Sequence, residues 1–349
     1  MPEALLADHT TLRLGGPAAR FVEATTEEEL LAAVTGADAA GTPVLLVAGG
    51  SNLVVADAGF DGLVVKVATR GVVADHEGDD PTCGGVLVRV AAGEPWDPFV
   101  ARAVGHGWAG VEALSGIPGA VGSTPIQNVG AYGQEVADTI ASVRTWDRRE
   151  QRQATFAAAD CGFAYRHSRF KAEPDRYLVL EVTFQLAVGS TGSPVRYAEL
   201  ARTLGVETGA RAPLAEVRDA VLALRRGKGM VLDADDHDTW SAGSFFTNPV
   251  LSTDQAAALP PEAPAYPMPD GSVKSSAAWL IDHAGFAKGY APHPDARVSL
   301  STKHPLALTN RGGASTEELL ALAREVRDGV EARFGVRLVN EPVTVGCAL

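Results

Sequence analysis

The sequence has few of the residues that build disulfide frameworks, metal sites or nucleic-acid-binding surfaces. Its 349 residues include three cysteines, Cys83, Cys161 and Cys347, and this odd, widely spaced set fits reduced thiols better than disulfides. The eight histidines form no metal-ligand spacing. Basic residues are outnumbered by acidic ones, 30 against 43, and the resulting net charge of −13 argues against a nucleic-acid partner.

Long apolar runs are also missing. No stretch approaches the length of a membrane span, and the first residues, MPEALLADHTTLRL, lack the basic and then apolar pattern of a signal peptide. Together with the few cysteines, this predicts a cytoplasmic protein without a membrane segment. No serine stands in a G-x-S-x-G pattern, so a serine hydrolase is excluded along with a metal hydrolase.

Three segments imitate known motifs without completing them. Gly105–Gly110, GHGWAG, matches the dinucleotide-binding fingerprint literally, but a predicted helix precedes it instead of a strand, so we expect a helix end and a turn. Arg226–Gly229, RGKG, lacks the other residues of a phosphate-binding loop. Asp233–Asp238, DADDHD, begins like a calcium loop but lacks its glycine and distal glutamate, so we expect a solvated acidic loop.

The order of the expected elements predicts an α+β protein rather than a doubly wound sheet, because several strands follow one another without helical crossovers. Thr26 and Ser315 each begin a capping box and mark the start of a helix. Strands are expected at residues 21–24, 44–48, 53–55, 63–67, 86–91, 142–147, 177–185 and 337–345. Further helices are expected at residues 97–104, 154–160, 197–204, 214–226, 279–283 and 316–334, and a proline-rich loop at 260–269.

The most informative segment is Ile117–Glu135, IPGAVGSTPIQNVGAYGQE, which holds four glycines and two prolines. So much glycine and proline predicts loop or turn backbone that approaches a ligand closely with its main-chain N–H groups. The neutral polar side chains of the segment suit a large, mostly uncharged ring system with a phosphate tail. On this segment alone, a glycine-rich connection packed between two domains is an equal alternative.

Three more segments stand out. Cys161–Lys171, CGFAYRHSRFK, gathers basic and aromatic side chains around Arg166, and Ser241–Pro249, SAGSFFTNP, places Ser244 between a glycine and two phenylalanines. Glu341 stands beside a proline in an otherwise apolar C-terminal strand. Taken singly, a surface ion pair, a helix cap and a strand-end carboxylate are adequate explanations of these three side chains.

Taken together, these segments resemble a known family. Residues 114–135, with VAGGSNLVV upstream and CGFAYRHSRFK, AGSFFTNP, DGSVKSSAAWLID and a late Glu-Pro downstream, are similar to the UDP-N-acetylenolpyruvoylglucosamine reductases of type I. These enzymes are also called UDP-N-acetylmuramate dehydrogenases. The resemblance runs in the right order from about Thr10 to Gly346, and its specificity lies in the combination rather than in any single motif.

The resemblance implies a vanillyl-alcohol-oxidase-like fold that binds FAD noncovalently. Two subdomains, residues 1–70 and 71–190, would hold the flavin, and a C-terminal α+β domain, residues 191–349, would cover the substrate. The loop at residues 49–52 would cradle the pyrophosphate through main-chain N–H groups, and it has no His or Cys to attach a flavin. The residues implied to line the cofactor are Gly49, Gly50, Ser51, Asn52, Gly119, Gly122, Ser123, Gln127, Asn128, Gly130 and Tyr132.

The implied reaction passes a hydride from NADPH through the flavin to the enolpyruvyl ether of UDP-N-acetylglucosamine-enolpyruvate, which gives UDP-N-acetylmuramate for peptidoglycan synthesis. Arg166 matches the family arginine that stabilises the substrate carboxylate, Glu341 matches its acidic partner, and Ser244 matches the general acid that protonates C2. The residues implied to bind the substrate are Tyr165, Tyr197, Lys228, Asn248, Tyr266 and Lys274.

Two other classes of protein stay open at this point. One is a flavin oxidase of the same fold that acts on an alcohol or a hydroxy acid. The other is a non-enzymatic module that binds a flavin or a nucleotide sugar, although such a module would not need Arg166, Ser244 and Glu341 together. The resemblance also implies a monomer with a small nucleotide-sugar substrate and no nucleic-acid or membrane partner.

Overall fold

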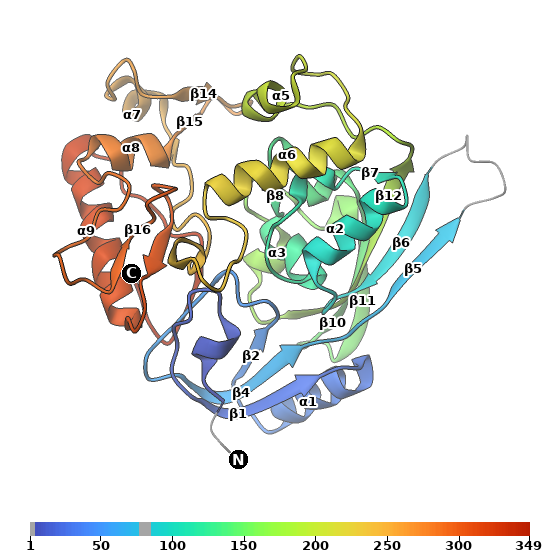
Figure 1. Ribbon diagram of the computed structural model, residues 1–349. Coiled ribbons are helices and arrows are strands. Elements are labelled where there is room, and N and C mark those ends of the chain that lie inside the picture. Colours follow the sequence, from blue (N-terminus) through green and yellow to red (C-terminus); the bar gives the residue numbers. More distant parts are fainter. Residues whose placement is uncertain (1–3, 77–84) are drawn as a thin grey trace. The chain divides into compact units, whose positions relative to one another are not determined.

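The computed structural model describes residues 4–76 and 85–349. The chain forms two compact units, and each unit is assembled from separate stretches of sequence (Figure 1). Unit 1 consists of Met1–Ala19, Gly50–Asp61 and Gly227–Leu349, and unit 2 of Arg20–Gly49 and Gly62–Arg226. Among the described residues, no helix is long and apolar enough to cross a membrane.

The largest sheet belongs to unit 2. Its strands run in the order β11–β10–β12–β6–β5, β7 also pairs with β12, and every pairing is antiparallel, so the sheet itself needs no helical crossover. Trp96, Phe99 and Phe184 pack against one another in the core of this unit. The strands are β5 (Val72–His76), β6 (Val86–Ala91), β7 (Trp108–Ala109), β10 (Ile140–Asp147), β11 (Arg152–Ala157) and β12 (Tyr177–Val188).

The prediction of a helix at residues 154–160 is wrong. Most of this stretch is strand β11, and only Ala158–Asp160 forms a single 3₁₀ turn, η5. Alanines favour a helix in isolation, but the whole length of β11 pairs with β10, with Gln153 opposite Trp146 and Thr155 opposite Arg144. This edge pairing satisfies the backbone groups and outweighs the local helix preference.

A second sheet has the strand order β1–β4–β2, and helix α1 connects β1 to β2 along the chain. The capping box predicted at Thr26 is confirmed: its side chain accepts from the Glu29 N–H at 3.2 Å, and the Glu29 carboxylate accepts from the Thr26 N–H at 3.3 Å. Strands β2 and β4 are parallel. The elements are β1 (Ala18–Ala24), α1 (Glu27–Ala39), β2 (Val44–Val47) and β4 (Phe60–Val67).

The remaining elements of unit 2 are mostly short. Helix α2 ends at Gly105 and leads through a turn into β7, so the GHGWAG segment is the predicted helix end and not a nucleotide-binding fingerprint. On α2, Asp97 accepts two hydrogen bonds from Arg218 on α6, at 2.6 and 2.9 Å. The elements are α2 (Trp96–Gly105), η2 (Glu112–Leu114), η3 (Val121–Ser123), α3 (Thr124–Gln127), β8 (Gly130–Ala131), β9 (Gln134–Glu135), η4 (Val136–Asp138), α4 (Arg169–Ala172), α5 (Ala198–Leu204) and α6 (Leu214–Gly227).

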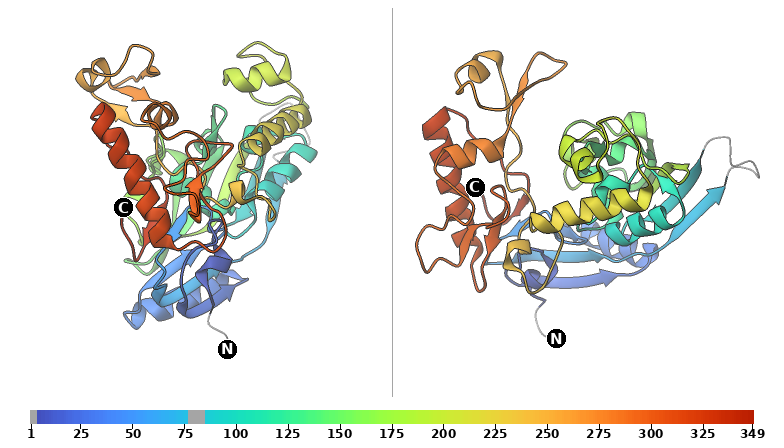
Figure 2. Two further views of the ribbon diagram at one scale, coloured as in Figure 1. Left: turned by 60° about the vertical axis from the view of Figure 1, so that its left-hand side comes forward. Right: turned by 45° about the horizontal axis from the view of Figure 1, so that its top comes forward.

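Unit 1 has its own core around α9, its longest helix (Figure 2). The predicted cap at Ser315 is confirmed, since its side chain accepts from the Glu318 N–H at 3.2 Å. Fully buried leucines and valines at helical spacing on α9 fill this core. The elements are η1 (Leu6–His9), β3 (Leu53–Val55), η6 (His237–Thr239), β13 (Val250–Leu251), α7 (Thr253–Ala257), β14 (Ala265–Pro267), β15 (Val273–Ser275), α8 (Ala277–His283), β16 (Val298–Leu300), β17 (Leu308–Asn310), α9 (Thr316–Phe334) and β18 (Val343–Val345).

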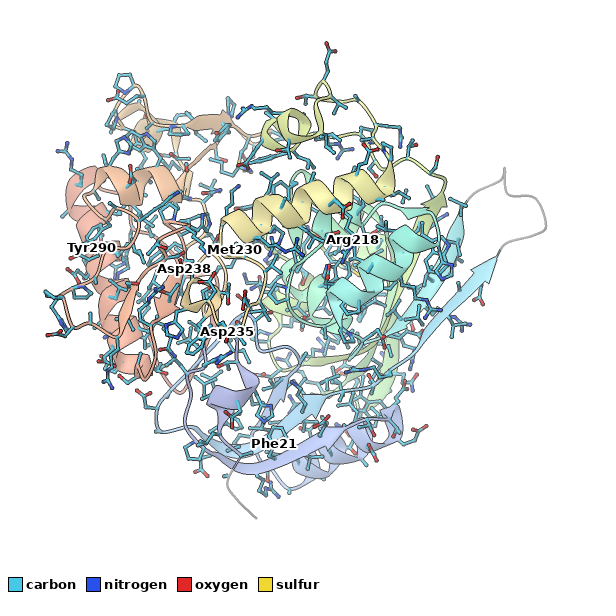
Figure 3. The ribbon with its side chains drawn as sticks, in the orientation of Figure 1. Phe21, Arg218, Met230, Asp235, Asp238 and Tyr290 are labelled. Carbon is cyan, nitrogen blue, oxygen red and sulfur yellow. The ribbon has the colours of Figure 1, made fainter. Side chains whose placement is uncertain are left out.

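Three sequence predictions for unit 1 need correction. The C-terminal strand covers only Val343–Val345 instead of residues 337–345, because Pro342 interrupts the strand. The proline-rich loop contains the short strand β14. The acidic segment ending at Asp238 is not simply solvated: Asp238, labelled in Figure 3, is 4% exposed and bonds to Thr302 and Arg311.

Cys83 lies outside the described residues, so the prediction of reduced thiols is tested only at the other two cysteines. Cys161 and Cys347 are not in disulfides. Burial raises the pKa of the Cys161 thiol to about 11, which makes it a poor nucleophile at neutral pH.

Candidate functional site

The glycine-rich segment at residues 117–135 lies in unit 2. The single turns η3 and α3 follow one another, and β8 and β9 form a hairpin. Pro125 stands in the first turn of α3, where its missing N–H sacrifices no hydrogen bond. The prediction of loop or turn backbone is therefore confirmed, and the turns are the short elements η3, α3 and the β8–β9 hairpin.

Glycines in this segment let backbone approach backbone. A Cβ on Gly49 would lie 2.5 Å from the Cα of Gly119, and one on Gly122 would lie 2.5 Å from the Cβ of Ala92. The Gly122 N–H also donates to the Ala92 carbonyl oxygen at 2.8 Å. Two segments that were predicted to bind one cofactor, around Gly49 and around Gly119, thus touch with no side chain between them.

Arg166 is bound to the same segment. Its Nη2 donates to the carbonyl oxygen of Gly130 at 2.9 Å, and its Nη1 donates to that of Asn128 at 3.3 Å. Arg166, Asn128 and Tyr132 all have left-handed backbone, with φ of 51°, 44° and 49°. Such conformations cost energy in non-glycine residues and are concentrated at functional sites.

The side chain of Asn128 joins the hairpin to the segment that carries Arg166. It is 1% exposed, and its Nδ2 donates to the Glu135 carboxylate at 2.8 Å and to the Ala164 carbonyl oxygen at 3.0 Å. Its Oδ1 accepts from the Ala137 N–H at 3.2 Å. Asn128 therefore shapes this site from within the protein, and its direct contact with a cofactor stays a prediction.

A second cation, Lys171, lies beside Arg166. Its Nζ donates to Gln127 Oε1 at 2.8 Å and to the Arg166 carbonyl oxygen at 3.0 Å. Lys171 belongs to the same segment, Cys161–Lys171, but had no predicted role. Because the protein as a whole is acidic, such a local pair of cations is what can attract an anionic ligand to this backbone.

Aromatic side chains lie around the hairpin. The rings of Tyr132 and Tyr197 meet edge to face, with centroids 5.6 Å apart, and Tyr197 is 46% exposed at the start of α5. The Tyr165 ring lies 5.5 Å from the guanidinium carbon of Arg166. Desolvation lowers the pKa of Arg225 on α6 to about 10, so this arginine still carries its charge at neutral pH.

Unit 1 brings Ser244 and Glu341 onto neighbouring segments. The Glu341 N–H donates to the Phe245 carbonyl oxygen at 2.8 Å, and Phe246 and Asn340 form an antiparallel bridge. The two phenylalanines are each 1% exposed, so their burial fixes the backbone on both sides of this contact. Two of the three predicted catalytic residues thus lie on neighbouring segments of unit 1, and the third, Arg166, belongs to unit 2.

His304, which had no predicted role, lies beside Ser244. The Ser244 Oγ is 3.5 Å from His304 Nε2, the upper limit of a hydrogen bond. The His304 N–H donates to Ser301 Oγ at 3.2 Å, which holds the turn that carries the imidazole. The two residues are 60 positions apart, and no local motif signals that they meet.

The predicted pyrophosphate loop continues from Gly49 of unit 2 into unit 1. Gly50 has a φ of 60°, and a Cβ on it would lie 1.9 Å from the His9 carbonyl oxygen, so only glycine fits there. The Asn52 carbonyl oxygen accepts from the Val343 N–H at 2.9 Å, where β3 and β18 begin to pair. This parallel pairing places the end of the loop two residues from Glu341.

The predicted substrate-binding residues of unit 1 lie on separate short elements. Lys274 on β15 is opposite Tyr266 on β14, and Tyr266 is 56% exposed. Asn248 Oδ1 accepts from the N–H of Ala277, the first residue of α8, at 3.0 Å. Lys228 directly follows α6. Their contact with a substrate stays a prediction. Across residues 4–76 and 85–349, no group of three or more His, Cys, Asp or Glu could hold a metal ion.

Two family models match the chain. Residues 18–153 match an FAD binding domain, and residues 235–345 match the C-terminal domain of UDP-N-acetylenolpyruvoylglucosamine reductase. The α+β fold with a flavin-binding part and a C-terminal domain is therefore the one expected from the sequence.

Curated proteins resemble the chain over nearly its whole length. UDP-N-acetylenolpyruvoylglucosamine reductase from Cutibacterium acnes is 60% identical over 99% of this chain and 90% of its own, and that from Thermobifida fusca is 58% identical over 99% and 97%. A crystal structure of UDP-N-acetylenolpyruvylglucosamine reductase from Thermus caldophilus superposes with a TM-score of 0.65, at 25% identity and 98% coverage of both chains.

Proposed function

Because the chain belongs to the UDP-N-acetylenolpyruvoylglucosamine reductase family, we propose that Arg166, Ser244 and Glu341 carry its chemistry. The protein is an FAD-dependent enzyme of peptidoglycan synthesis that reduces UDP-N-acetylglucosamine-enolpyruvate to UDP-N-acetylmuramate with NADPH. A bound flavin would supply hydride transfer from NADPH to C3 of the enolpyruvyl group. The alternative of a flavin oxidase has no support in these relatives.

The residues of unit 2 fit a flavin held without a covalent bond. Gly49 and Gly119 expose side-chain-free backbone at their contact, which lets a cofactor approach the main chain closely. Lys171 and Arg166 supply positive charge within the same region. We propose that the predicted set from Gly49–Asn52 to Tyr132 lines this cofactor.

Ser244 is proposed to protonate C2 of the substrate. A serine hydroxyl is a weak acid, but it suffices where the intermediate is strongly basic and held in contact with it. His304 Nε2, 3.5 Å from the Ser244 Oγ, is placed to return a proton to that oxygen. The single observation that supports this assignment is the hydrogen bond from the Glu341 N–H to the Phe245 carbonyl oxygen, which joins the backbone segments that carry Ser244 and Glu341.

Arg166 and Glu341 are proposed to act on the substrate carboxylate as negative charge develops there. The two carbonyl bonds of Arg166 fix the orientation of its guanidinium, so that its charge needs no rearrangement during the reaction. An anionic Glu341 would oppose this developing charge, so Glu341 would act either in its protonated form or by orienting Arg166.

The nucleotide-sugar contacts are proposed for residues that the sequence comparison selected. Lys228 and Lys274 would bind the diphosphate, and Tyr266, opposite Lys274 in its hairpin, would contact the substrate beside it. Tyr197 would cover the substrate from α5. The two other proposed contacts are Tyr165 and Asn248.

We further propose that the enzyme is a cytoplasmic monomer without a nucleic-acid partner. The net charge of −13 supports the last point, and the thiols of Cys161 and Cys347 support a reducing compartment. Residues 1–70 and 71–190 are proposed as the flavin-binding subdomains and 191–349 as the substrate-binding domain.

Absorbance spectroscopy tests the function directly. The purified protein should be yellow, NADPH should bleach it, and UDP-N-acetylglucosamine-enolpyruvate should restore the colour without oxygen. Rapid reoxidation by air alone, with no response to the enolpyruvyl substrate, would contradict the assignment.

A further inference from the structure

Glu112 in η2 is a buried carboxyl group that the proposed chemistry does not use. It is 0% exposed, and it accepts three hydrogen bonds from separate parts of unit 2. The Gly110 N–H donates to its Oε2 at 2.6 Å, and the Ser193 N–H and Gln134 Nε2 donate to its Oε1 at 2.6 and 2.8 Å. A buried charge is expensive unless it is bonded in this way, so its retention calls for a reason.

The donors connect two functional segments. Gln134 begins β9 of the hairpin that carries Tyr132, and its Oε1 accepts from the Ala113 N–H at 2.8 Å. Ser193 lies at the base of the segment that carries Tyr197. Glu112 is thus bonded both to the hairpin of the flavin-binding region and to the approach to α5.

Residues 191–196 before α5 and residues 209–213 after it run antiparallel to each other, and we call these two segments the stalk. The N–H of Gly192 donates to the Ala212 carbonyl oxygen at 2.8 Å, and that of Val195 donates to Ala210 at the same distance. Arg211 Nη1 donates to the Gly192 carbonyl oxygen at 2.7 Å. These bonds hold the two arms of the stalk to each other, and Glu112 bonds one arm to η2.

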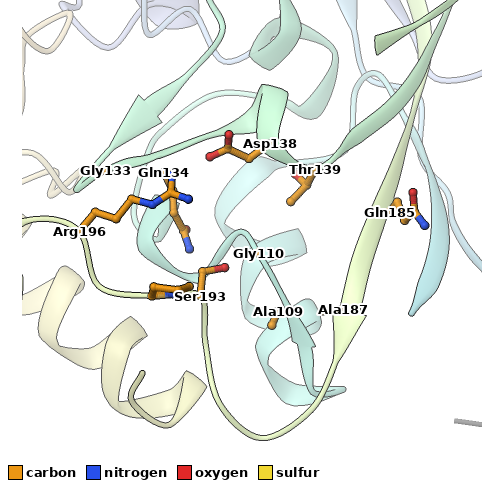
Figure 4. A pocket seen from close by; sticks show the side chains of 11 residues that line it. Ala109, Gly110, Gly133, Gln134, Asp138, Thr139, Gln185, Ala187, Ser193 and Arg196 are labelled. Atoms are coloured by element: carbon orange, nitrogen blue, oxygen red, sulfur yellow. The ribbon is translucent and has the colours of Figure 1, made fainter. Parts of the chain in front are cut away.

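Val195 and Ala212, each 3% exposed, pack with residues of α5 and α6 and hold one side of the stalk. A half-open cavity of about 370 Å³ lies against it, and Ser193, Pro194 and Arg196 of the stalk line it together with Gly110 and Gln134 (Figure 4). Three of these lining residues, Gly110, Gln134 and Ser193, are the bonding partners of Glu112. On the side that faces the cavity, these hydrogen bonds to a charged group help to set the position of the backbone.

The backbone at Gly192 lies so close to the Glu112 carboxylate that no side chain fits between them. A Cβ at this position would lie 2.7 Å from Glu112 Oε1, so any larger residue would force the carboxylate and the stalk apart. Gly189, three positions earlier in the same connection, is exposed, and a Cβ on it would meet nothing within 4 Å. The two glycines therefore form a matched pair, one inside the Glu112 contact and one outside it.

We propose that Glu112 is a positioning residue for substrate binding: its carboxylate locks the base of the stalk to the flavin-side hairpin and so holds Tyr197 over the nucleotide sugar. This inference rests on the substrate-covering role proposed for Tyr197. Tyr197 follows the stalk, and its ring contacts the ring of Tyr132 on the hairpin, with centroids 5.6 Å apart. The stalk and the hairpin are therefore joined both at Glu112 and at this ring contact.

The test is Glu112→Gln, assayed as the holoenzyme. An amide has one acceptor oxygen, so its NH₂ must face either the Gly110 N–H or the donors from Gln134 and Ser193. We expect the KM for UDP-N-acetylglucosamine-enolpyruvate to rise about tenfold, while FAD content and the rate of flavin reduction by NADPH stay as in the parent chain.

Gly192→Ala should reproduce this KM increase with the carboxylate intact, and Gly189→Ala should leave the KM unchanged. The Glu112→Gln change should add less than about twofold in a Tyr197→Ala background, since the stalk then has no tyrosine to hold. Trypsin cleavage after Arg196 and Arg202 should also accelerate in Glu112→Gln and not in Gly189→Ala.

An unchanged KM in folded, flavin-loaded Glu112→Gln would overturn the inference, and so would a full tenfold increase on top of Tyr197→Ala. An unchanged KM in the single variant Tyr197→Ala would instead refute the role proposed for Tyr197. If Glu112→Gln does not fold, Gly192→Ala takes its place, both as a single variant and in the Tyr197→Ala background, with the same expected and contradicting KM values.

Discussion

The guanidinium of Arg166 donates to the carbonyl oxygen of Gly130 at 2.9 Å, so the cation proposed for catalysis is attached to the backbone proposed to hold the flavin. The left-handed backbone of Arg166 and its second bond, to the Asn128 carbonyl oxygen, add to this constraint. Arg166 is therefore positioned before any ligand binds, which is the arrangement that electrostatic catalysis requires.

Arg166→Lys should retain the charge and lose the geometry. An ammonium group cannot reproduce the planar fork that contacts two carbonyl oxygens. We expect flavin reoxidation by the enolpyruvyl substrate to slow about 100-fold, equivalent to about 2.7 kcal/mol, measured by anaerobic stopped flow. Arg169→Lys is the control, because Arg169 lies against the Phe156 ring, where a lysine can also pack. Equal rates in Arg166→Lys and the parent would refute the proposed role.

Ser244→Ala should separate the two half-reactions. Loss of the proton donor should cost about 3 kcal/mol or more in substrate reduction, and flavin reduction by NADPH should be nearly unaffected. Single-turnover traces of each step provide the measurement. Ser252→Ala, which removes an exposed helix cap on α7, should leave both rates unchanged. Crippled flavin reduction with normal reoxidation would be the opposite of what the assignment requires.

Lys228→Ala should weaken binding of the nucleotide sugar. If Lys228 contacts the diphosphate, its removal deletes a charge-assisted hydrogen bond and should raise the substrate KM at least about tenfold. Steady-state kinetics at fixed NADPH give this value. Lys288, an exposed lysine of the same unit, provides a control of equal charge change. A KM that moves equally in both variants would point to net charge rather than to a contact.

Gly122→Ala should impair FAD retention. Its methyl group would lie 2.5 Å from the Ala92 Cβ and 2.9 Å from the Ala92 Cα, so one of the two backbones must shift. We expect less flavin per protein after gel filtration, read from the ratio of visible to ultraviolet absorbance. Gly105→Ala, within the false dinucleotide fingerprint, meets nothing within 4 Å and should keep its full flavin content.

Asp238 should make unit 1 sensitive to acid. Burial would raise the pKa of Asp238, but hydrogen bonds from Thr302 and the charge of Arg311 outweigh it and hold the pKa below its ordinary value. Because the folded pKa is the lower one, the stabilisation is complete above the unfolded pKa of about 3.9 and is lost as the pH falls through the folded pKa.

Asp238→Asn should therefore lower the free energy of unfolding at pH 7 by about 2 kcal/mol, and this difference should shrink below about pH 4. Urea unfolding at a series of pH values measures it. Asp235→Asn, at an exposed position labelled with Asp238 in Figure 3, should have little effect at any pH. A constant difference across the whole pH range would contradict the explanation.

The sequence predicted secondary structure best where the stabilising hydrogen bonds join residues close together in the chain. The capping boxes at Thr26 and Ser315 marked their helices correctly, because the bonds that define them span three residues. The strand at residues 152–157 was missed, because its alanines carry a helix preference that only the pairing with the preceding strand β10 overrides.

In the candidate site, some residues could be predicted from sequence motifs and others could be found only in the folded structure. Family motifs selected Arg166, Ser244 and Glu341 by residue type and order. They gave no sign of His304 or Glu112, since the partners of these residues are brought together only by the fold. A glutamate between a valine and an alanine reads as an ordinary helix residue in the sequence, and its role emerges from its three donors.

The interlaced chain path of unit 1 has a consequence for synthesis. Asn310 Nδ2 donates to the Leu12 carbonyl oxygen, a partner 298 residues away, and Leu12 and Leu14 belong to the core that α9 completes. On the ribosome, unit 2 can fold once Arg226 has emerged. Leu12 and Leu14 stay exposed to solvent until the last third of the chain, which completes their core, has been synthesised. Nascent chains stalled before α9 should therefore be strong clients of chaperones that bind exposed apolar segments.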